Sequence, residues 1–198
     1  MVITYQGDNY FKLQSGEDVI LIDPTNQRSF KGTILVIKTE EPTLVAAEKK
    51  DNNIEQSFPF LINHQGEYEI KNIQVKGVSA GYDEKEKEEN TIYQINFDEI
   101  KILCLGHLKK ELDPKLLAGL EEVDIMILPG GGKPYLNEAQ AAKIVRQIAP
   151  SIIIPSLFKD VKNFLKEFDA TKLEPQDKLV IKKKDLKPEA LSVVWLKP

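Results

Sequence analysis

Two short runs of consecutive apolar residues constrain the fold of this chain most strongly. They are Ile34–Ile37 and Ile152–Ile154. An aliphatic run with no polar alternation is typical of a β-strand that is buried on both faces. We therefore predict that these two strands lie inside sheets, with other parts of the chain covering both sides.

The sequence before residue 100 predicts mainly strands joined by turns. Residues Gln14 to Asp18 have the composition of a hairpin turn, and Pro24 ends the following strand because proline cannot donate a hydrogen bond to a sheet. Two longer segments further along alternate apolar and polar residues, as strands with one solvated face do. The predicted strands are Val2–Tyr5, Tyr10–Gln14, Val19–Ile22, Ile34–Ile37, Glu67–Val78 and Asn90–Phe97.

After residue 100, predicted strands and helices alternate. A short helix is predicted to begin at Pro114, and a longer one is capped by Asn137 and continues to Ile148 with apolar residues at helical spacing. We find no internal repeat and no linker, so residues 1–198 are predicted to form a single domain. The remaining predicted elements are strands at Lys101–Leu105, Val123–Leu128, Ser151–Ile154, Leu179–Ile181 and Leu191–Leu196, and a helix near Asp160–Phe168.

Composition excludes some classes of protein and of site. The chain has 198 residues, enough for one domain with a substantial core, and a net charge of −4. An acidic protein is a poor general binder of nucleic acid, because binding phosphates requires a basic surface. Cys104 is the single cysteine, so the chain can form neither an internal disulfide nor a zinc site built from cysteine pairs.

The sequence shows no sign of export or of membrane insertion. The first residues lack the basic start and apolar run of a signal peptide, and no apolar stretch approaches the roughly 18–20 residues that cross a bilayer. We therefore expect a soluble cytoplasmic protein that does not bind membranes. The charged run Tyr82–Glu89 predicts a solvated loop, with an acidic interaction loop as the alternative.

Four stretches occur in the order found in one known family. They are Ile3–Phe11 with Ile20–Pro24, then Gly66–Ile70, then Asn90–Tyr93 through Leu105–Gly106, and finally Val123–Gly132 with Pro150–Pro155. Over nearly the whole chain they resemble the metallo-β-lactamase superfamily. The resemblance is closest to its small branch of ascorbate-phosphate lactonase-like proteins and metal-dependent hydrolases.

The resemblance implies an α/β fold, a four-layer αβ/βα sandwich of two mixed β-sheets flanked by helices. Enzymes of this fold bind one or two metal ions, usually zinc, which lower the pKa of a bound water and stabilise the oxyanion of the substrate. Their ligands come from an H-x-H-x-D-H loop after a buried strand and from later histidine and aspartate residues.

The family's ligand positions are replaced in this sequence. The resemblance places them on Asp8, Thr39, Glu41, Thr43, Leu44, Tyr82 or Gly81, His107 and Leu157. None of these positions keeps the family's residue, and a chain with 2 histidines cannot supply an H-x-H-x-D-H site under any alignment. We therefore predict a degenerate former metal site with no catalytic residue and no cofactor.

A rebuilt metal site is the alternative. With Asp8 and Glu41, His107 would form a two-carboxylate, one-histidine set for one divalent metal ion such as zinc. Against this, Leu44 and Leu157 place apolar side chains at former ligand positions. We expect these leucines to meet where the metals would lie, each contributing about 1.5–3 kcal/mol through burial.

Other chemically suggestive residues have structural interpretations. We expect Cys104 to be a buried structural cysteine and His64 a surface histidine. Gly130–Lys133 lacks the spacing of a phosphate-binding loop and predicts a turn at a strand end. A basic run predicts a charged edge strand, with a nucleic-acid or protein adaptor surface as the alternative. Its members are Lys178, Lys182, Lys183, Lys184 and Lys187.

These observations predict a catalytically inactive, metal-free protein of the metallo-β-lactamase fold, a pseudoenzyme that binds a ligand or a partner. The alternative is a metal-dependent hydrolase of phosphodiester or lactone type with a site around Asp8, Glu41 and His107. The sequence leaves open which ligand or partner is bound and whether the protein forms a homo-oligomer.

Overall fold

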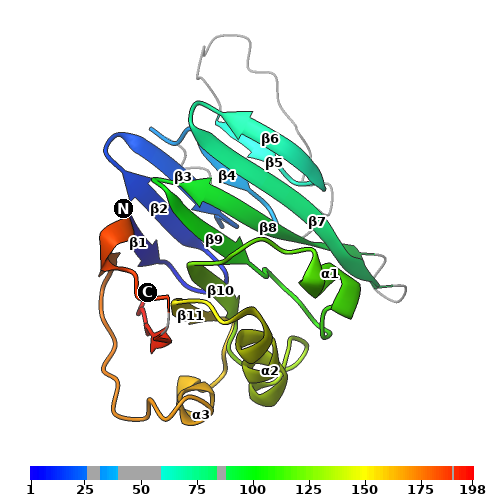
Figure 1. The fold of residues 1–198 in the computed structure, drawn as a ribbon, viewed down its shortest axis with the longest axis vertical. Coiled ribbons are helices and arrows are strands. Elements are labelled where there is room, and N and C mark those ends of the chain that lie inside the picture. Colours follow the sequence, from blue (N-terminus) through cyan, green and yellow to red (C-terminus); the bar gives the residue numbers. More distant parts are fainter. Residues whose placement is uncertain (26–31, 40–58, 84–87, 189) are drawn as a thin grey trace.

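The strands form two mixed β-sheets that pack face to face (Figure 1). The computed structural model describes residues 1–25, 32–39, 59–83, 88–188 and 190–198. The first sheet is antiparallel from its first to its fourth strand and parallel beyond. In spatial order it contains β12 (Leu179–Val180), β1 (Val2–Tyr5), β2 (Phe11–Ser15), β3 (Asp18–Ile22), β4 (Leu35–Ile37) and β5 (Phe60–Ile62).

The second sheet joins a parallel half to an antiparallel half. Its order is β13 (Ser192–Val193), β11 (Ile152–Ser156), β10 (Ile125–Pro129), β9 (Ile100–Cys104), β8 (Glu88–Phe97), β7 (Ile73–Asp83) and β6 (Gly66–Ile70). The strands from β13 to β9 run parallel, and those from β9 to β6 are antiparallel. β9, β10 and β11 therefore end at the same edge of the sheet.

The helices lie on the outer side of the second sheet, as α2 shows most clearly (Figure 1). As predicted, Asn137 caps α2, and its side chain forms a reciprocal capping box with Gln140. Ile144 and Val145 are buried against the sheet, and Ile148 packs beside them. No helix among the described residues is long and apolar enough to span a bilayer. The helices are α1 (Pro114–Ala118), α2 (Glu138–Ile148), α3 (Val161–Lys166) and a 3₁₀ turn, η2 (Lys183–Asp185).

The two apolar runs are buried on both faces, as predicted. In β4, Leu35 and Ile37 lie in the core between the two sheets, whereas Val36 joins an apolar cluster on the opposite face. In β11, Ile154 faces the core between the sheets and Ile153 faces the helices. The two strands thus contribute side chains to three apolar layers, which are the core between the sheets, the layer under the helices and the cluster on the outer face of the first sheet. This arrangement confirms the layered α/β fold.

The predicted single strand from Glu67 to Val78 was wrong, because the structure divides it into the hairpin β6–β7. The chain turns at Lys71 and Asn72, and Lys71 has a positive φ of 56°. The apolar positions change phase at this turn, from Tyr68 and Ile70 before it to Ile73 and Val75 after it. That phase change, together with Asn72, was the available signal of a tight turn.

Candidate functional site

A cluster of polar side chains lies where strands from both sheets end. Asp23 follows β3, Thr39 lies two residues beyond β4, and His107 lies three residues beyond β9. Ser156 is the last residue of β11, and Asn9 lies in the turn between β1 and β2. Parallel strands carry their carboxyl ends to the same edge of a sheet, so the order of the strands brings these residues together.

Asp23 is the centre of this cluster and is only 9% exposed. One carboxylate oxygen, Oδ1, accepts a hydrogen bond from the backbone N–H of Thr39 at 2.8 Å. The other, Oδ2, accepts from the Thr39 hydroxyl and from the Asn9 side-chain amide, both at 2.6 Å. Three donors therefore hold one buried carboxylate, which satisfies the requirement that a buried charge be hydrogen-bonded.

The Thr39 hydroxyl connects Asp23 to His107. Its oxygen lies 2.9 Å from Nδ1 of His107, and that nitrogen lies 3.7 Å from Oδ2 of Asp23. Because the hydroxyl hydrogen is donated to the carboxylate, the hydroxyl oxygen accepts from Nδ1–H. This assignment from the hydrogen-bond pattern gives His107 the Nδ1–H tautomer. The imidazole is 14% exposed, and its ring lies beside that of Tyr135.

Asn9 extends the network to the second sheet. Its side-chain oxygen accepts a hydrogen bond from the Ser156 hydroxyl at 2.9 Å. Asn9 and Ser156 are both buried, so each needs such a partner. The network therefore crosses the sandwich twice, through Thr39 and His107 and through Asn9 and Ser156.

Cys104 lies fully buried beneath this network, which confirms the expectation of a structural cysteine. Burial raises the pKa of its thiol to about 12, and the nearby charge of Asp23 raises it further, against smaller opposing effects of hydrogen bonds. A thiol with this pKa carries almost no thiolate at neutral pH. Cys104 is thus unsuited to act as a nucleophile.

Gly106 allows the two sheets to approach at the site. Its φ is +56°, and a Cβ atom at this position would overlap the side chain of Thr39. A residue with a side chain would therefore be strained in its backbone and would also push Thr39 away from Asp23. Gly106 is therefore required for the hydrogen bonds between Thr39, Asp23 and His107.

The structure brings only part of the predicted former metal site together. Thr39 and His107 are in contact, as described. The backbone oxygen of Asp8 accepts a hydrogen bond from the N–H of Leu157 at 3.1 Å, so these two positions are neighbours. Asp8 is exposed and Leu157 is half-buried. Tyr82 is 57% exposed, and its side chain takes no part in the network around Asp23.

Glu41, Thr43 and Leu44 lie outside the described residues. The contact between Leu44 and Leu157, and the metal set of Asp8, Glu41 and His107, therefore remain predictions. Leu157 is half-buried. The expected cost of Leu157→Ala is accordingly smaller than for a core leucine.

Sequence reasoning missed Asp23, Asn9 and Ser156. Asp23 drew no attention beside the strand-ending Pro24, although a carboxylate placed directly after the apolar run Val19–Ile22 lies next to a buried region. Asn9 and Ser156 gave no comparable local signal, because their partners lie far away in the sequence.

The structure also places the other residues that the sequence singled out. His64 is exposed in the turn between β5 and β6, which confirms it as a surface histidine. Gly130 follows β10 directly and donates its N–H to the backbone oxygen of Ser156, in line with a turn at a strand end. Among the described residues, β12 pairs with β1 alone and is an edge strand. The prediction that the basic run forms this edge strand was wrong, because its lysines flank β12 and Lys183 and Lys184 lie in η2. Within that run, Lys183 pairs with Asp124 at 2.6 Å.

The side chains at this edge do not fit a zinc pair. Such a site needs several imidazole and carboxylate ligands with free lone pairs. Here Thr39 stands at the first ligand position, Asp23 already accepts three hydrogen bonds, and His107 offers only Nε2, because Nδ1 is engaged with Thr39. The described residues contain no group of three or more His, Cys, Asp or Glu side chains that could hold a metal ion.

Two facing mixed sheets with a polar site at the carboxyl ends of the strands define a protein of the metallo-β-lactamase fold. Residues 2–156 match the family described as the β-lactamase superfamily domain, and the chain belongs to this family. No curated protein matches the sequence.

Solved structures agree with this fold. A protein from Thermotoga maritima, described as a Zn-dependent hydrolase of the metallo-β-lactamase superfamily, is 20% identical with a TM-score of 0.74, and the match covers 99% of both chains. A metallo-hydrolase from Ignicoccus hospitalis is 16% identical with a TM-score of 0.65, covering 98% of this chain and 94% of the other. The metallo-β-lactamase fold protein YhfI from Bacillus subtilis is 10% identical with a TM-score of 0.64, covering 97% and 95%.

Proposed function

We propose that this protein is a metal-independent member of its family that binds a ligand or partner instead of hydrolysing a substrate. The observation that carries the proposal is the position of the Thr39 hydroxyl between the carboxylate of Asp23 and the imidazole of His107. At the edge where the family binds metal ions, the polar side chains of this protein form hydrogen bonds with one another.

The energetics of the network support this proposal. A metal ion could recruit Asp23 only by displacing one of the three hydrogen bonds that satisfy this buried carboxylate. Each such bond to a charged group contributes about 1.5–3 kcal/mol. His107 offers a single nitrogen, Nε2, because Nδ1 carries the hydrogen that is donated to Thr39. In a zinc enzyme the same loop offers preformed ligands at no such cost. The 2 histidines of the whole chain also limit the imidazoles available, and His64 is exposed in the turn between β5 and β6.

A metal-dependent hydrolase with a rebuilt site is the second candidate. The observation in its favour is that His107 lies at the family's metal-binding edge, 3.7 Å from a carboxylate oxygen of Asp23. Asp8 and Glu41 would complete the set that the sequence suggested. Solved structures with this fold are described as metal-dependent hydrolases of several kinds, so the fold itself is compatible with hydrolysis.

Metal content and activity distinguish the two candidates. We expect protein purified without added metal to contain far less than one zinc per chain by elemental analysis. Hydrolysis of bis-p-nitrophenyl phosphate and of a simple lactone should stay at background with and without added zinc or manganese. Stoichiometric zinc and activity that are lost in His107→Ala but kept in the control His64→Ala would establish the hydrolase instead.

A further inference from the structure

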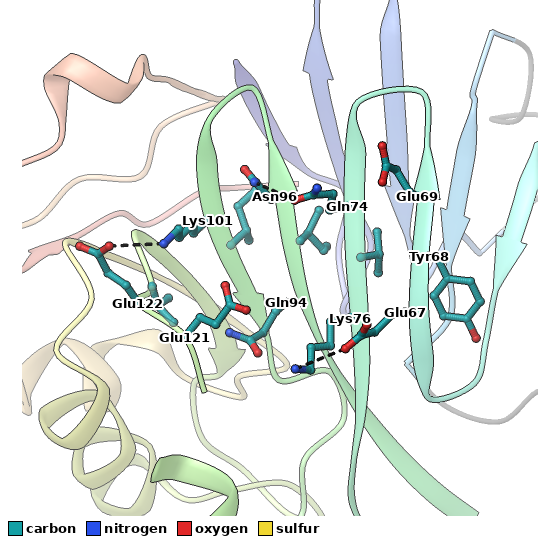
Figure 2. Close-up of a pocket in the computed structure, with 14 residues that line it drawn as sticks. Glu67, Tyr68, Glu69, Gln74, Lys76, Gln94, Asn96, Lys101, Glu121 and Glu122 are labelled. Carbon is teal, nitrogen blue, oxygen red and sulfur yellow. Dashed lines mark hydrogen bonds and ion pairs between the residues drawn. The ribbon is translucent and has the colours of Figure 1, made fainter. Parts of the chain in front are cut away.

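The first sheet ends at β5, and no strand in the described part of the chain pairs with the outer edge of β5. Phe60 and Leu61 are 50% and 52% exposed, and nowhere else among the described residues do two large exposed apolar side chains adjoin. Leu61 lies on the outer face of the sheet with Val36, whereas Phe60 lies on the inner face, where its ring is 6.5 Å from that of Tyr68. Figure 2 shows that the Tyr68 ring points away from the polar hollow on the outer face of the second sheet. β5 therefore presents apolar side chains on both of its faces.

The backbone of Leu61 is directed towards this open edge. On the β4 side, the N–H of Phe60 donates to the oxygen of Ile34 at 3.0 Å, and the oxygen of Ile62 accepts from the N–H of Lys38 at 2.8 Å. Successive residues of a strand direct their backbone groups to opposite sides, so the N–H and C=O of Leu61 point away from β4. An edge of this kind is a template for another strand.

The two edges of the first sheet differ in charge. At the other edge, β12 lies between Lys178 and Lys182, which are both exposed. Lysines at an edge oppose the addition of a strand, because their charges would have to be desolvated. Residues 59–65, which contain β5, include no Asp, Glu, Lys or Arg. The β5 edge thus lacks the protection that the β12 edge has.

These features define the strand that would fit beside β5. It must be uncharged and apolar on both faces, because it would lie next to Phe60 on one face and next to Leu61 on the other. β5 itself meets both conditions. In an antiparallel pair about a two-fold axis, Leu61 would lie opposite Leu61 of a second copy and exchange both backbone hydrogen bonds with it. Phe60 would then lie opposite Ile62 of that copy, and the two-fold axis would close the pair.

We propose that the protein forms a homodimer in which β5 pairs antiparallel with β5 of a second copy. Each strand has 3 residues, so the interface is small and the dimer should dissociate in the micromolar range. The interface does not involve Asp23, Thr39 or His107. It therefore goes beyond the proposed function, and the two can fail independently.

Analytical ultracentrifugation of the intact protein tests the dimer. From about 1 to 300 µM, the average mass should rise from one chain towards two. Leu61→Lys should raise the Kd for dimerisation at least about tenfold, because it brings two ammonium groups together at the two-fold axis. The Leu61 side chain is half exposed, so the Tm of the variant should stay close to that of the wild-type protein. The matched control Val180→Lys, at an exposed position of β12, should leave the Kd unchanged.

Cross-linking with a short bismaleimide tests the register. Leu61→Cys should form covalent dimers readily. Asn63→Cys should not, because in this register residue 63 lies opposite residue 59 and its two copies are about 13 Å apart along the strands. The unsubstituted protein, whose Cys104 is fully buried, gives the background.

Two results would overturn the proposal. A mass of one chain at every concentration would leave the β5 edge without a second copy as its partner. A dimer that persists in Leu61→Lys, or equal cross-linking through positions 61 and 63, would place the contact elsewhere on the molecule.

Discussion

The hydroxyl oxygen of Thr39 lies 2.9 Å from Nδ1 of His107, and this contact joins the carboxyl edges of the two sheets. In a metallo-β-lactamase fold these edges normally hold metal ligands. Here the contact depends on Asp23, whose carboxylate accepts the Thr39 hydroxyl hydrogen and so turns the hydroxyl oxygen towards the imidazole. The stability of this edge should therefore depend on hydrogen bonds, and the following predictions test that dependence.

Asp23→Asn should destabilise the protein by about 2–4 kcal/mol, measured by urea denaturation. An amide in place of the carboxylate turns one acceptor into a donor that faces the donors of Thr39 and Asn9. The matched control is Asp18→Asn at the other end of β3, where the carboxylate is 37% exposed and pairs with exposed Lys71. That surface pair should contribute less than about 1 kcal/mol. Equal effects of the two substitutions would contradict a specific role for Asp23.

Gly106→Ala should cost more than Gly16→Ala, although both glycines have nearly the same backbone conformation, with φ of +56° and +57°. At Gly16 nothing lies within 4 Å of the added Cβ atom, so only backbone strain is added. At Gly106 the Cβ atom also overlaps Thr39. We expect an additional loss of about 1–3 kcal/mol in the free energy of unfolding, measured by denaturant titration. Similar losses in both variants would show that Thr39 can move away from position 106 without loss of stability.

Wild-type protein should lose stability between pH 8 and pH 10 through Cys104. Burial raises the pKa of the folded thiol to about 12, whereas the thiol of the unfolded chain ionises near pH 8.5. The contribution is therefore complete below the unfolded pKa and is lost as the pH rises towards the folded pKa. Over this window the loss is about 2 kcal/mol. Cys104→Ala should remove this slope in urea titrations, and an unchanged slope would assign it to other groups.

Long-range ¹H–¹⁵N NMR of the histidine rings should show the Nδ1–H tautomer for neutral His107. The Thr39 hydroxyl fixes this tautomer by accepting from Nδ1–H, and exposed His64 provides an internal reference. Thr39→Val keeps the shape of the side chain but removes the acceptor, so the tautomer preference should weaken. A dominant Nε2–H tautomer in the wild-type protein would contradict the direction of the hydrogen bond.

Local patterns predicted most of the fold. The apolar runs Ile34–Ile37 and Ile152–Ile154 placed two strands with both faces buried, and the capping residue Asn137 placed the start of α2. The hairpin at Lys71 was missed, because alternation of period two was followed through a turn where its phase changes. The prediction of a closing strand at Leu191–Leu196 was too long, since the strand is Ser192–Val193.

The sequence by itself determined that a histidine-rich metal site cannot form, because this conclusion needs only the count of 2 histidines. It also determined which strands are buried on both faces, because such burial leaves an unbroken apolar run along the chain. Only the tertiary structure decided that Asp23, Thr39 and His107 form one network, since Thr39 is 16 residues from Asp23 and 68 residues from His107. The order of strands in each sheet and the face-to-face packing of the sheets create these contacts. No local pattern specifies such an order, because apolar burial drives strands together without direction, whereas a hydrogen bond requires particular partners.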